Sequence, residues 1–241
     1  MKILSLGALF EHTKGSNLNE LDLSMNNVVF DTHGGFRLDN MRVLKKQRVG
    51  LLNVLVIQNL VNDNLLEINL SDNPIVNDES LLEFFRRLNK LQVLELRNVS
   101  LGNLEDIHLN FKLFKCDLAF NKLRSLNRVS FSGLTNLAYL DLSFNQISYI
   151  QMSTFESTKN LEKLNLESNR IRSIDNSSNN FLETVPPLDF VNIFKDITSK
   201  LTEIILNNNR IQFFSKRLIP YSKKVKKIVL DSNEIGIFEK D

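Results

Sequence analysis

Hydrophobic residues recur with one spacing along most of the chain. Residues 65–75 read LxxLxLxxNxL, a frame of aliphatic positions with asparagine third from its end. The same frame fits residues 18–28, 65–75, 91–101, 113–123, 137–147, 161–171, 201–211 and 225–235. The asparagine position departs only in the frame 91–101, where it holds Val99. One asparagine column kept through so many segments indicates a structural repeat.

Each frame predicts a short strand that is buried on one side. Residues two apart on a strand point the same way, so Leu140 and Leu142 face inward while Tyr139 faces solvent. Such a short strand buries its apolar side only by stacking on its neighbours in a parallel sheet. The asparagine amide is expected to satisfy backbone groups at the strand end. Val99 cannot do this, which predicts a local irregularity, with Asn98 as the candidate substitute.

The spacers between frames carry a second set of apolar positions. One set lies three residues past the frame: Leu104, Leu126, Ile150, Ile174, Phe214 and Phe238. Another lies eight residues past it: Phe36, Leu109, Phe131, Phe155 and Ile219. These side chains are expected to fill the core on the side away from the strands.

The frame and its phenylalanine-bearing spacer resemble the leucine-rich repeat family. The resemblance is to the 24-residue typical subtype of extracellular leucine-rich proteins, such as Toll-like receptor ectodomains and insect leucine-rich immune proteins, and segment 131–171 is closest to it. It implies an α/β solenoid: a leucine-rich repeat horseshoe with a parallel concave β-sheet and an irregular or short-helical convex side. About nine repeats are expected, because the gap between the first two frames leaves room for one degenerate copy.

The predicted organisation is one leucine-rich repeat domain over residues 1–241, with two departures. The degenerate repeat lies within 37–62, and an insertion lies within 172–200, where the unit beginning at Leu161 is unusually long. Phe190, Ile193, Phe194 and Ile197 recur there at helical spacing and predict a short amphipathic helix. The insertion is either a functional protrusion or a tolerated surface loop.

The composition limits which kinds of binding site and catalytic site the chain can form. The 41 leucines and 31 asparagines are explained by the repeat, and a net charge of +2 lacks the basic excess that phosphate binding needs. The single cysteine, Cys116, excludes an internal disulfide. It stands at an inward position, so we expect a buried apolar side chain, the alternative being a reactive thiol. The three histidines, His12, His33 and His108, do not cluster. We expect no enzyme, no metal site and no cofactor.

The outward strand positions form the predicted binding surface. The central repeats carry its largest side chains, and the candidate partner-binding residues are Phe120, Phe144, Tyr139, Glu95, Arg97, Lys115, Asp117, Asp141 and Lys163. Aromatic residues among charges are typical of interface hot spots, and the carboxylates favour a basic partner. The alternative is that the rings only fill the turn and that the charges are ordinary solvated groups.

These patterns predict a non-catalytic scaffold that recognises a protein partner on its concave face. The resemblance implies a secreted or receptor-ectodomain module, with a cytoplasmic adaptor as the alternative. Glycan or lipid-derived ligands are compatible, whereas nucleic acid is not expected. No apolar run approaches the length of a membrane span. Lys2 and the apolar residues 3–10 have the outline of a signal peptide, but no small-residue cleavage site follows.

Overall fold

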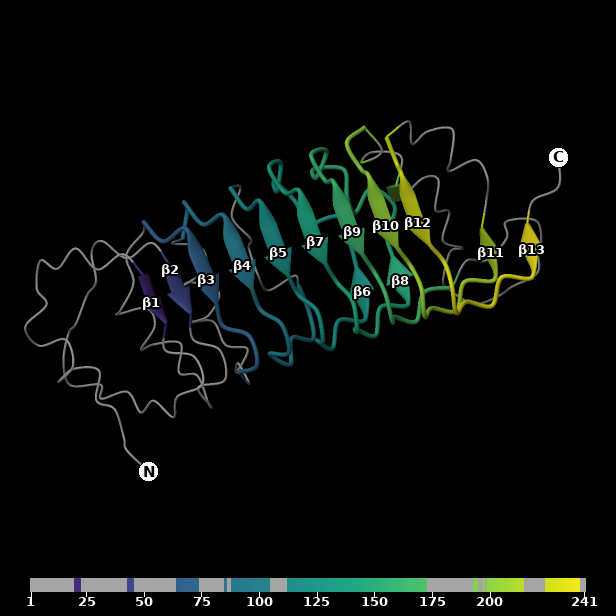
Figure 1. Cartoon of the computed structure of the whole chain (residues 1–241), viewed down its shortest axis with the longest axis horizontal. Helices are drawn as coiled ribbons and strands as arrows, with labels where there is room; N and C mark the ends of the chain where they lie inside the picture. Colours follow the sequence, from purple (N-terminus) through teal and green to yellow (C-terminus); the bar gives the residue numbers. More distant parts are fainter. Residues whose placement is uncertain are drawn as a thin grey trace, which may run out of the picture.

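Nine parallel strands form one continuous sheet. The computed structural model describes residues 20–22, 43–45, 64–73, 85, 88–104, 112–172, 193–194, 197, 199–214 and 224–238. The sheet strands are β1 (Glu20–Asp22), β2 (Val43–Lys45), β3 (Glu67–Asn69), β4 (Val93–Glu95), β5 (Lys115–Asp117), β7 (Tyr139–Asp141), β9 (Lys163–Asn165), β10 (Glu203–Ile205) and β12 (Lys227–Val229). They follow chain order and lie side by side along the long axis of the molecule (Figure 1).

The central residue of each well-described strand points into the core. Leu94, Cys116, Leu140 and Leu164 pair in register across β4, β5, β7 and β9, and each is at most 2% exposed. This confirms the predicted inward column. Burial raises the pKa of the Cys116 thiol, which favours the apolar role of this side chain over a reactive one.

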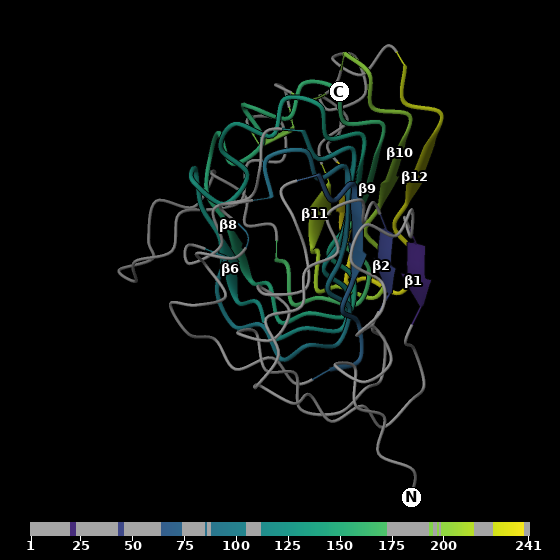
Figure 2. The ribbon, with the colours of Figure 1, turned by 90° about the vertical axis from the view of Figure 1, so that its left-hand side faces the viewer.

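Shorter strands line the side opposite the long sheet. β6 (Ser125–Leu126) pairs with β8 (Tyr149–Ile150), and β11 (Phe213–Phe214) pairs with β13 (Ile237–Phe238). Seen along the solenoid, β6 and β8 lie across the core from the sheet (Figure 2). Turns follow them at residues 128–133 and 152–157. The fold is therefore the predicted parallel solenoid. Its short-helical convex side and its count of about nine repeats stay predictions, because much of the spacer sequence lies outside the described residues.

A stack of phenylalanine rings fills the core behind the sheet. Phe131 and Phe155 are 5.7 Å apart between ring centroids, and Phe155 and Phe194 are 6.1 Å apart. All three are fully buried. Phe194 and Ile197, which were assigned to the insertion, are thus core residues, and Ile193–Phe194 are helical as predicted. Phe190 and most of the other residues of the insertion lie outside the described residues.

The recurring asparagine position forms a hydrogen-bonded ladder. Asn145 Nδ2 donates to the carbonyl oxygens of Leu118 (3.0 Å) and Leu142 (3.0 Å), and its Oδ1 accepts from Leu123 N (3.0 Å). One amide therefore joins its own repeat to the preceding one. Asn121, Asn169, Asn209 and Asn233 repeat this arrangement. The predicted role of the column is confirmed.

The repeat with Val99 is irregular, but Asn98 does not replace the missing amide. Asn98 Nδ2 donates to Asp72 Oδ1 at the surface (2.9 Å). Its backbone φ of 54° turns the side chain away from the buried position, so that prediction was wrong. Asn121 of the next repeat instead accepts from Val99 N (3.1 Å) and Leu101 N (2.9 Å).

β2 lies within the segment predicted to hold the degenerate repeat. It pairs in register with β1 on one side and with β3 on the other. The remainder of 37–62 lies outside the described residues, and the domain limits stay predictions. Among the described residues, no helix is long and apolar enough to cross a membrane.

Candidate functional site

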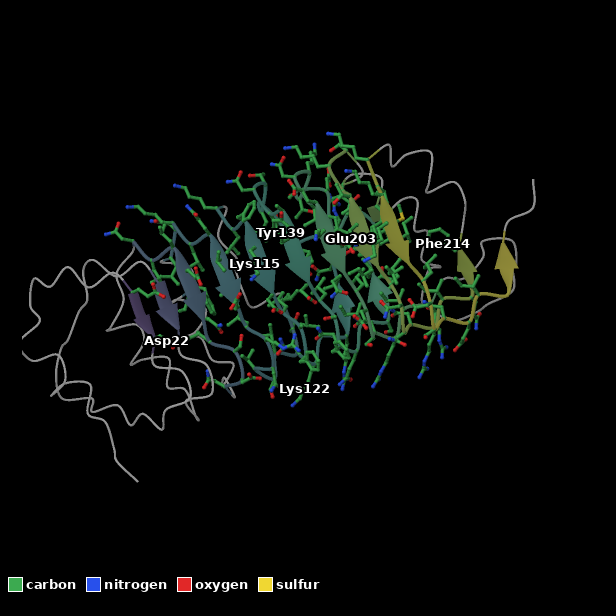
Figure 3. All side chains as sticks on the ribbon, in the orientation of Figure 1. Asp22, Lys115, Lys122, Tyr139, Glu203 and Phe214 are labelled. Carbon is green, nitrogen blue, oxygen red and sulfur yellow. The ribbon has the colours of Figure 1, made fainter. Side chains whose placement is uncertain are left out.

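The candidate residues lie on the solvent side of the long sheet or just past its strand ends. We call this side the sheet face; it is the face predicted to be concave. Glu95, Lys115, Asp117, Tyr139, Asp141 and Lys163 lie within strands, while Arg97, Phe120 and Phe144 follow strand ends. Lys115, Tyr139 and Glu203 lie along the sheet, whereas Lys122 lies at its edge beyond the strand ends (Figure 3).

Three carboxylates stand on adjacent strands at the last strand position. Glu95 pairs in register with Asp117, and Asp117 with Asp141. We call these three residues the carboxylate row. Its two outer residues accept hydrogen bonds from side-chain amides: Asn69 Nδ2 donates to Glu95 Oε2 (2.6 Å), and Asn165 Nδ2 donates to Asp141 Oδ2 (3.1 Å).

Asp117, in the middle of the row, is the least compensated of the three. Its Oδ1 accepts from Ala119 N (2.9 Å), and among the described residues no cation lies within ion-pair distance of it. Burial raises the pKa of Asp117, and the charges of Asp141 and Glu95 raise it further; the Ala119 hydrogen bond and Arg97 oppose them. The folded protein therefore disfavours the charged form of this side chain.

The backbone explains part of the row but not its charge. Asp141 Oδ1 accepts from Ser143 N (2.9 Å), the same turn bond that Asp117 makes two residues onward. Asn69 and Asn165 make this bond with neutral amides. The turn needs only an acceptor oxygen, so the negative charges of Asp117 and Asp141 have no structural requirement there.

Phe120 and Phe144 form an exposed aromatic stack at the carboxyl ends of β5 and β7. Their rings are nearly parallel, with centroids 4.2 Å apart, and the residues are 38% and 41% exposed. The guanidinium carbon of Arg97 lies 3.9 Å from the Phe120 centroid. The structure thus brings together three of the predicted residues.

The backbone at these two rings is unusual for bulky side chains. Phe120 and Phe144 have φ of 59° and 54°, in the left-handed region. The other described repeats also have positive φ here, but with small or polar residues: Asp72, Asn98, Ser168, Asn208 and Ser232. A left-handed residue with a Cβ costs roughly 1–2 kcal/mol, and Asn and Asp tolerate it best. Backbone preference therefore does not account for phenylalanine.

Tyr139 does not join this stack. It lies at the start of β7, where its ring meets Phe114 edge to face (centroids 5.1 Å apart) and its hydroxyl donates to Glu162 Oε2 (3.3 Å). Sequence reasoning missed Phe114, which is 48% exposed. The only available signal was an aromatic residue at a frame position that other repeats fill with varied side chains.

The lysines of the sheet face are largely paired. Lys115 Nζ lies 2.7 Å from Glu95 Oε1, and this hydrogen bond raises the pKa of Lys115. Lys163 lies 3.3 Å from Glu203, which also pairs with Lys227 at 2.6 Å. In the described part of the chain, no three His, Cys, Asp or Glu side chains are placed to hold a metal ion. The arrangement offers contact surface and charge for non-covalent binding.

Comparison with known proteins agrees with this architecture. The sequence pattern of the leucine-rich repeat family matches residues 89–147 and 112–171. No curated protein is significantly similar to the chain in sequence.

Solved structures share the fold. An internalin (inlF) from Listeria monocytogenes has a TM-score of 0.67 at 18% identity, covering 98% of this chain and 67% of the internalin. TLR13, in complex with single-stranded RNA, has a TM-score of 0.64 at 23% identity, covering 92% of this chain but only 34% of TLR13. A chain of the octameric complex of latrophilin 3, Unc5D and FLRT2 has a TM-score of 0.55 at 18% identity, covering 86% of this chain and 68% of that one. With the recurrent frame and the asparagine ladder, these matches show that the described chain has the leucine-rich repeat fold and that residues 89–171 carry the sequence pattern of the leucine-rich repeat family.

Proposed function

We propose that this chain is a non-catalytic scaffold that binds a protein partner through its sheet face. The observation that carries the proposal is the aromatic stack. Phe120 and Phe144 hold two exposed rings in a backbone conformation that other repeats fill with small or polar residues. Exposed, preorganised aromatic side chains are the usual anchors of protein interfaces.

The surroundings of the stack support an interface. Phe114 and Tyr139 form a second aromatic pair on the same two repeats, toward the amino ends of β5 and β7. Asp117 and Asp141 lie between the two pairs in sequence and on the same face. Apolar anchors with polar groups between them give a surface both affinity and register.

Charge favours a protein partner over nucleic acid. The described sheet face carries more carboxylates than cations around the stack, and its lysines are paired with glutamates. Phosphate binding needs an unpaired basic surface. TLR13 is solved with RNA and FLRT2 with protein partners; this chain's acidic face supports the second kind of partner. A glycan or lipid-derived ligand is the alternative.

The resemblance to Toll-like receptor and FLRT2 structures supports an extracellular or receptor-ectodomain setting. A cytoplasmic adaptor is the alternative. Fusing a reporter to the chain and measuring whether the fusion is secreted would distinguish the extracellular setting from the cytoplasmic one.

A capture experiment tests the proposed binding face. Immobilised full-length chain is compared with the variant Phe144→Asn/Tyr139→Ala, and bound proteins are quantified by mass spectrometry. The matched control is Val129→Ala/Met152→Ala, which removes exposed apolar side chains in the turns opposite the sheet. Far-UV circular dichroism checks that all three proteins are folded.

The expected result is a protein captured by the wild type and the control but lost or reduced at least fivefold in the sheet-face variant. Equal capture by all three folded proteins would show that the sheet face is not the binding surface.

A further inference from the structure

One face of the Phe120–Phe144 stack is covered and the other is open. The two rings lie nearly parallel, so each turns one face toward its partner and one face away. Arg97 covers the outer face of Phe120 with its guanidinium carbon 3.9 Å from the ring centroid. No ring or cation of the described residues lies on the outer face of Phe144, and the next repeat has the small Ser168 at the equivalent position.

The repeat next to this open face carries an acidic residue, Glu167. Phe144 N donates to the carbonyl oxygen of Glu167 (2.9 Å), which places the two residues next to each other on adjacent repeats. Glu167 Oε1 accepts from Asn207 Nδ2 (2.9 Å), and no cation in the described part of the chain pairs with its carboxylate. The repeat at the open end of the stack therefore has Glu167 at the frame position where the repeat at the closed end has Arg97.

We propose that the outer face of Phe144 binds an arginine side chain of a basic protein segment, with the guanidinium stacked on the ring and paired with Glu167. The inference rests on the proposed function and names the chemistry of the partner. The rest of the segment lies along the carboxylate row.

The molecule already contains this contact once. Arg97 on Phe120 shows that the stack accepts a planar guanidinium at van der Waals distance. A guanidinium both stacks on an aromatic face and donates two parallel hydrogen bonds to a carboxylate, whereas an ammonium acts as a point charge. The open site offers both elements, and so it favours arginine over lysine.

Charge complementarity extends beyond the single side chain. Asp117 and Asp141 lie on neighbouring strands, about 5 Å apart along the sheet. Asp117 has no ion-pair partner among the described residues, and burial, together with the charges of Asp141 and Glu95, raises its pKa. A basic segment that crosses the strands would supply the missing positive charge.

Short labelled peptides test the proposal with the full-length chain. The probes are fluorescein-labelled nona-arginine and nona-lysine, with binding followed by fluorescence anisotropy near physiological ionic strength. The variants are Phe144→Asn and Glu167→Gln. Asparagine suits the left-handed backbone at position 144 and occupies the same column at Asn98 and Asn208, so the fold is retained. The control is Glu156→Gln, which removes one negative charge from an exposed turn opposite the sheet.

Nona-arginine is expected to bind the wild type at least threefold more tightly than nona-lysine. Phe144→Asn should weaken nona-arginine about fivefold and remove the difference between the peptides, because the stacking contact is lost. Glu167→Gln should weaken both peptides about threefold, and Glu156→Gln should change neither.

Equal affinity for the two peptides, or an unchanged nona-arginine affinity in Phe144→Asn, would overturn the proposal. If the chain bound a labelled oligo-uridine and not nona-arginine, the proposal that its partner is a basic protein segment would be wrong. The capture experiment stays independent: capture that depends on the sheet face, with no arginine preference, would leave the proposed function standing and refute only this inference.

Discussion

Two repeats of this solenoid differ in how they satisfy the backbone groups of the buried turn after the strand. In the repeat 137–147, Asn145 supplies its own amide to the buried turn. In the repeat 91–101, Val99 supplies none, and Asn121 from the following repeat donates to Leu96 O (2.7 Å) and accepts from two backbone N–H groups. The repeat with Val99 also needs a positive φ at Ser100 (67°).

The difference shows that the ladder is redundant for carbonyl groups but not for N–H groups. Leu118 O accepts from both Asn121 and Asn145, and Leu142 O accepts from both Asn145 and Asn169. Each buried N–H, in contrast, has one amide oxygen as its partner. Losing an asparagine therefore costs most where the adjacent repeat already lacks one.

The largest effect is expected for Asn121→Val. It leaves Leu96 O, Val99 N and Leu101 N without their partners, since no other described amide reaches them. Each unpaired buried group costs about 1–3 kcal/mol, so the free energy of unfolding should fall by about 4 kcal/mol. Urea unfolding followed by circular dichroism measures it, because the chain has no tryptophan. A loss below about 1 kcal/mol would contradict the ladder.

Asn145→Val should be milder. Leu118 O and Leu142 O, which accept from Asn145, still accept from Asn121 and Asn169 in this variant. The Leu123 N–H is the group that loses its partner. We expect a loss of about 2 kcal/mol in the same assay. A loss equal to that of Asn121→Val would show that the redundancy has no energetic value.

Val99→Asn, which restores the missing amide, should change the free energy of unfolding by less than about 1 kcal/mol. Asn121 already serves Leu96 O, and Asn73 already serves Leu70 O. The informative measurement is the double variant Val99→Asn/Asn121→Val, in which the new amide should recover part of the loss. No recovery would mean that the backbone at Ser100 cannot accept the standard geometry.

The same two types of repeat differ on the sheet face, where the smallest effect is expected. Glu95 has Lys115 and Asn69 as partners, while Asp117 has no cation. Because its folded pKa is raised above the ordinary value of 3.8, the folded state binds the proton more tightly than the unfolded state. The stability gained from protonation is present at low pH and is lost as the pH rises through the raised pKa.

Asp117→Asn should therefore be more stable than the wild type at pH 7, since asparagine keeps the acceptor oxygen of the turn bond. The difference in the free energy of unfolding between the variant and the wild type should become smaller as the pH falls toward 4. Unfolding curves at several pH values measure it, and a wild type that is the more stable protein at pH 7 would refute the assignment.

Sequence reasoning was most successful where the repeat imposes one residue type. Leucine columns and asparagines have a fixed buried role, so Leu140 and Asn145 could be placed from spacing alone. Contacts between variable positions could not be placed in this way. The pairing of Tyr139 with Phe114 depends on side-chain direction, and the left-handed backbone of Phe120 contradicts the usual preference of a bulky residue.

The stack of Phe131, Phe155 and Phe194 has a practical consequence for engineering. Twenty-four positions separate the first two rings and 39 separate the last two, yet the ring spacings are 5.7 and 6.1 Å. β9 and β10 likewise pair in register across the longer segment. The number of residues between two successive repeats therefore does not change the distance between those repeats in the solenoid. A reporter peptide or an affinity tag added between two repeats is therefore expected to leave the spacing of the rings unchanged.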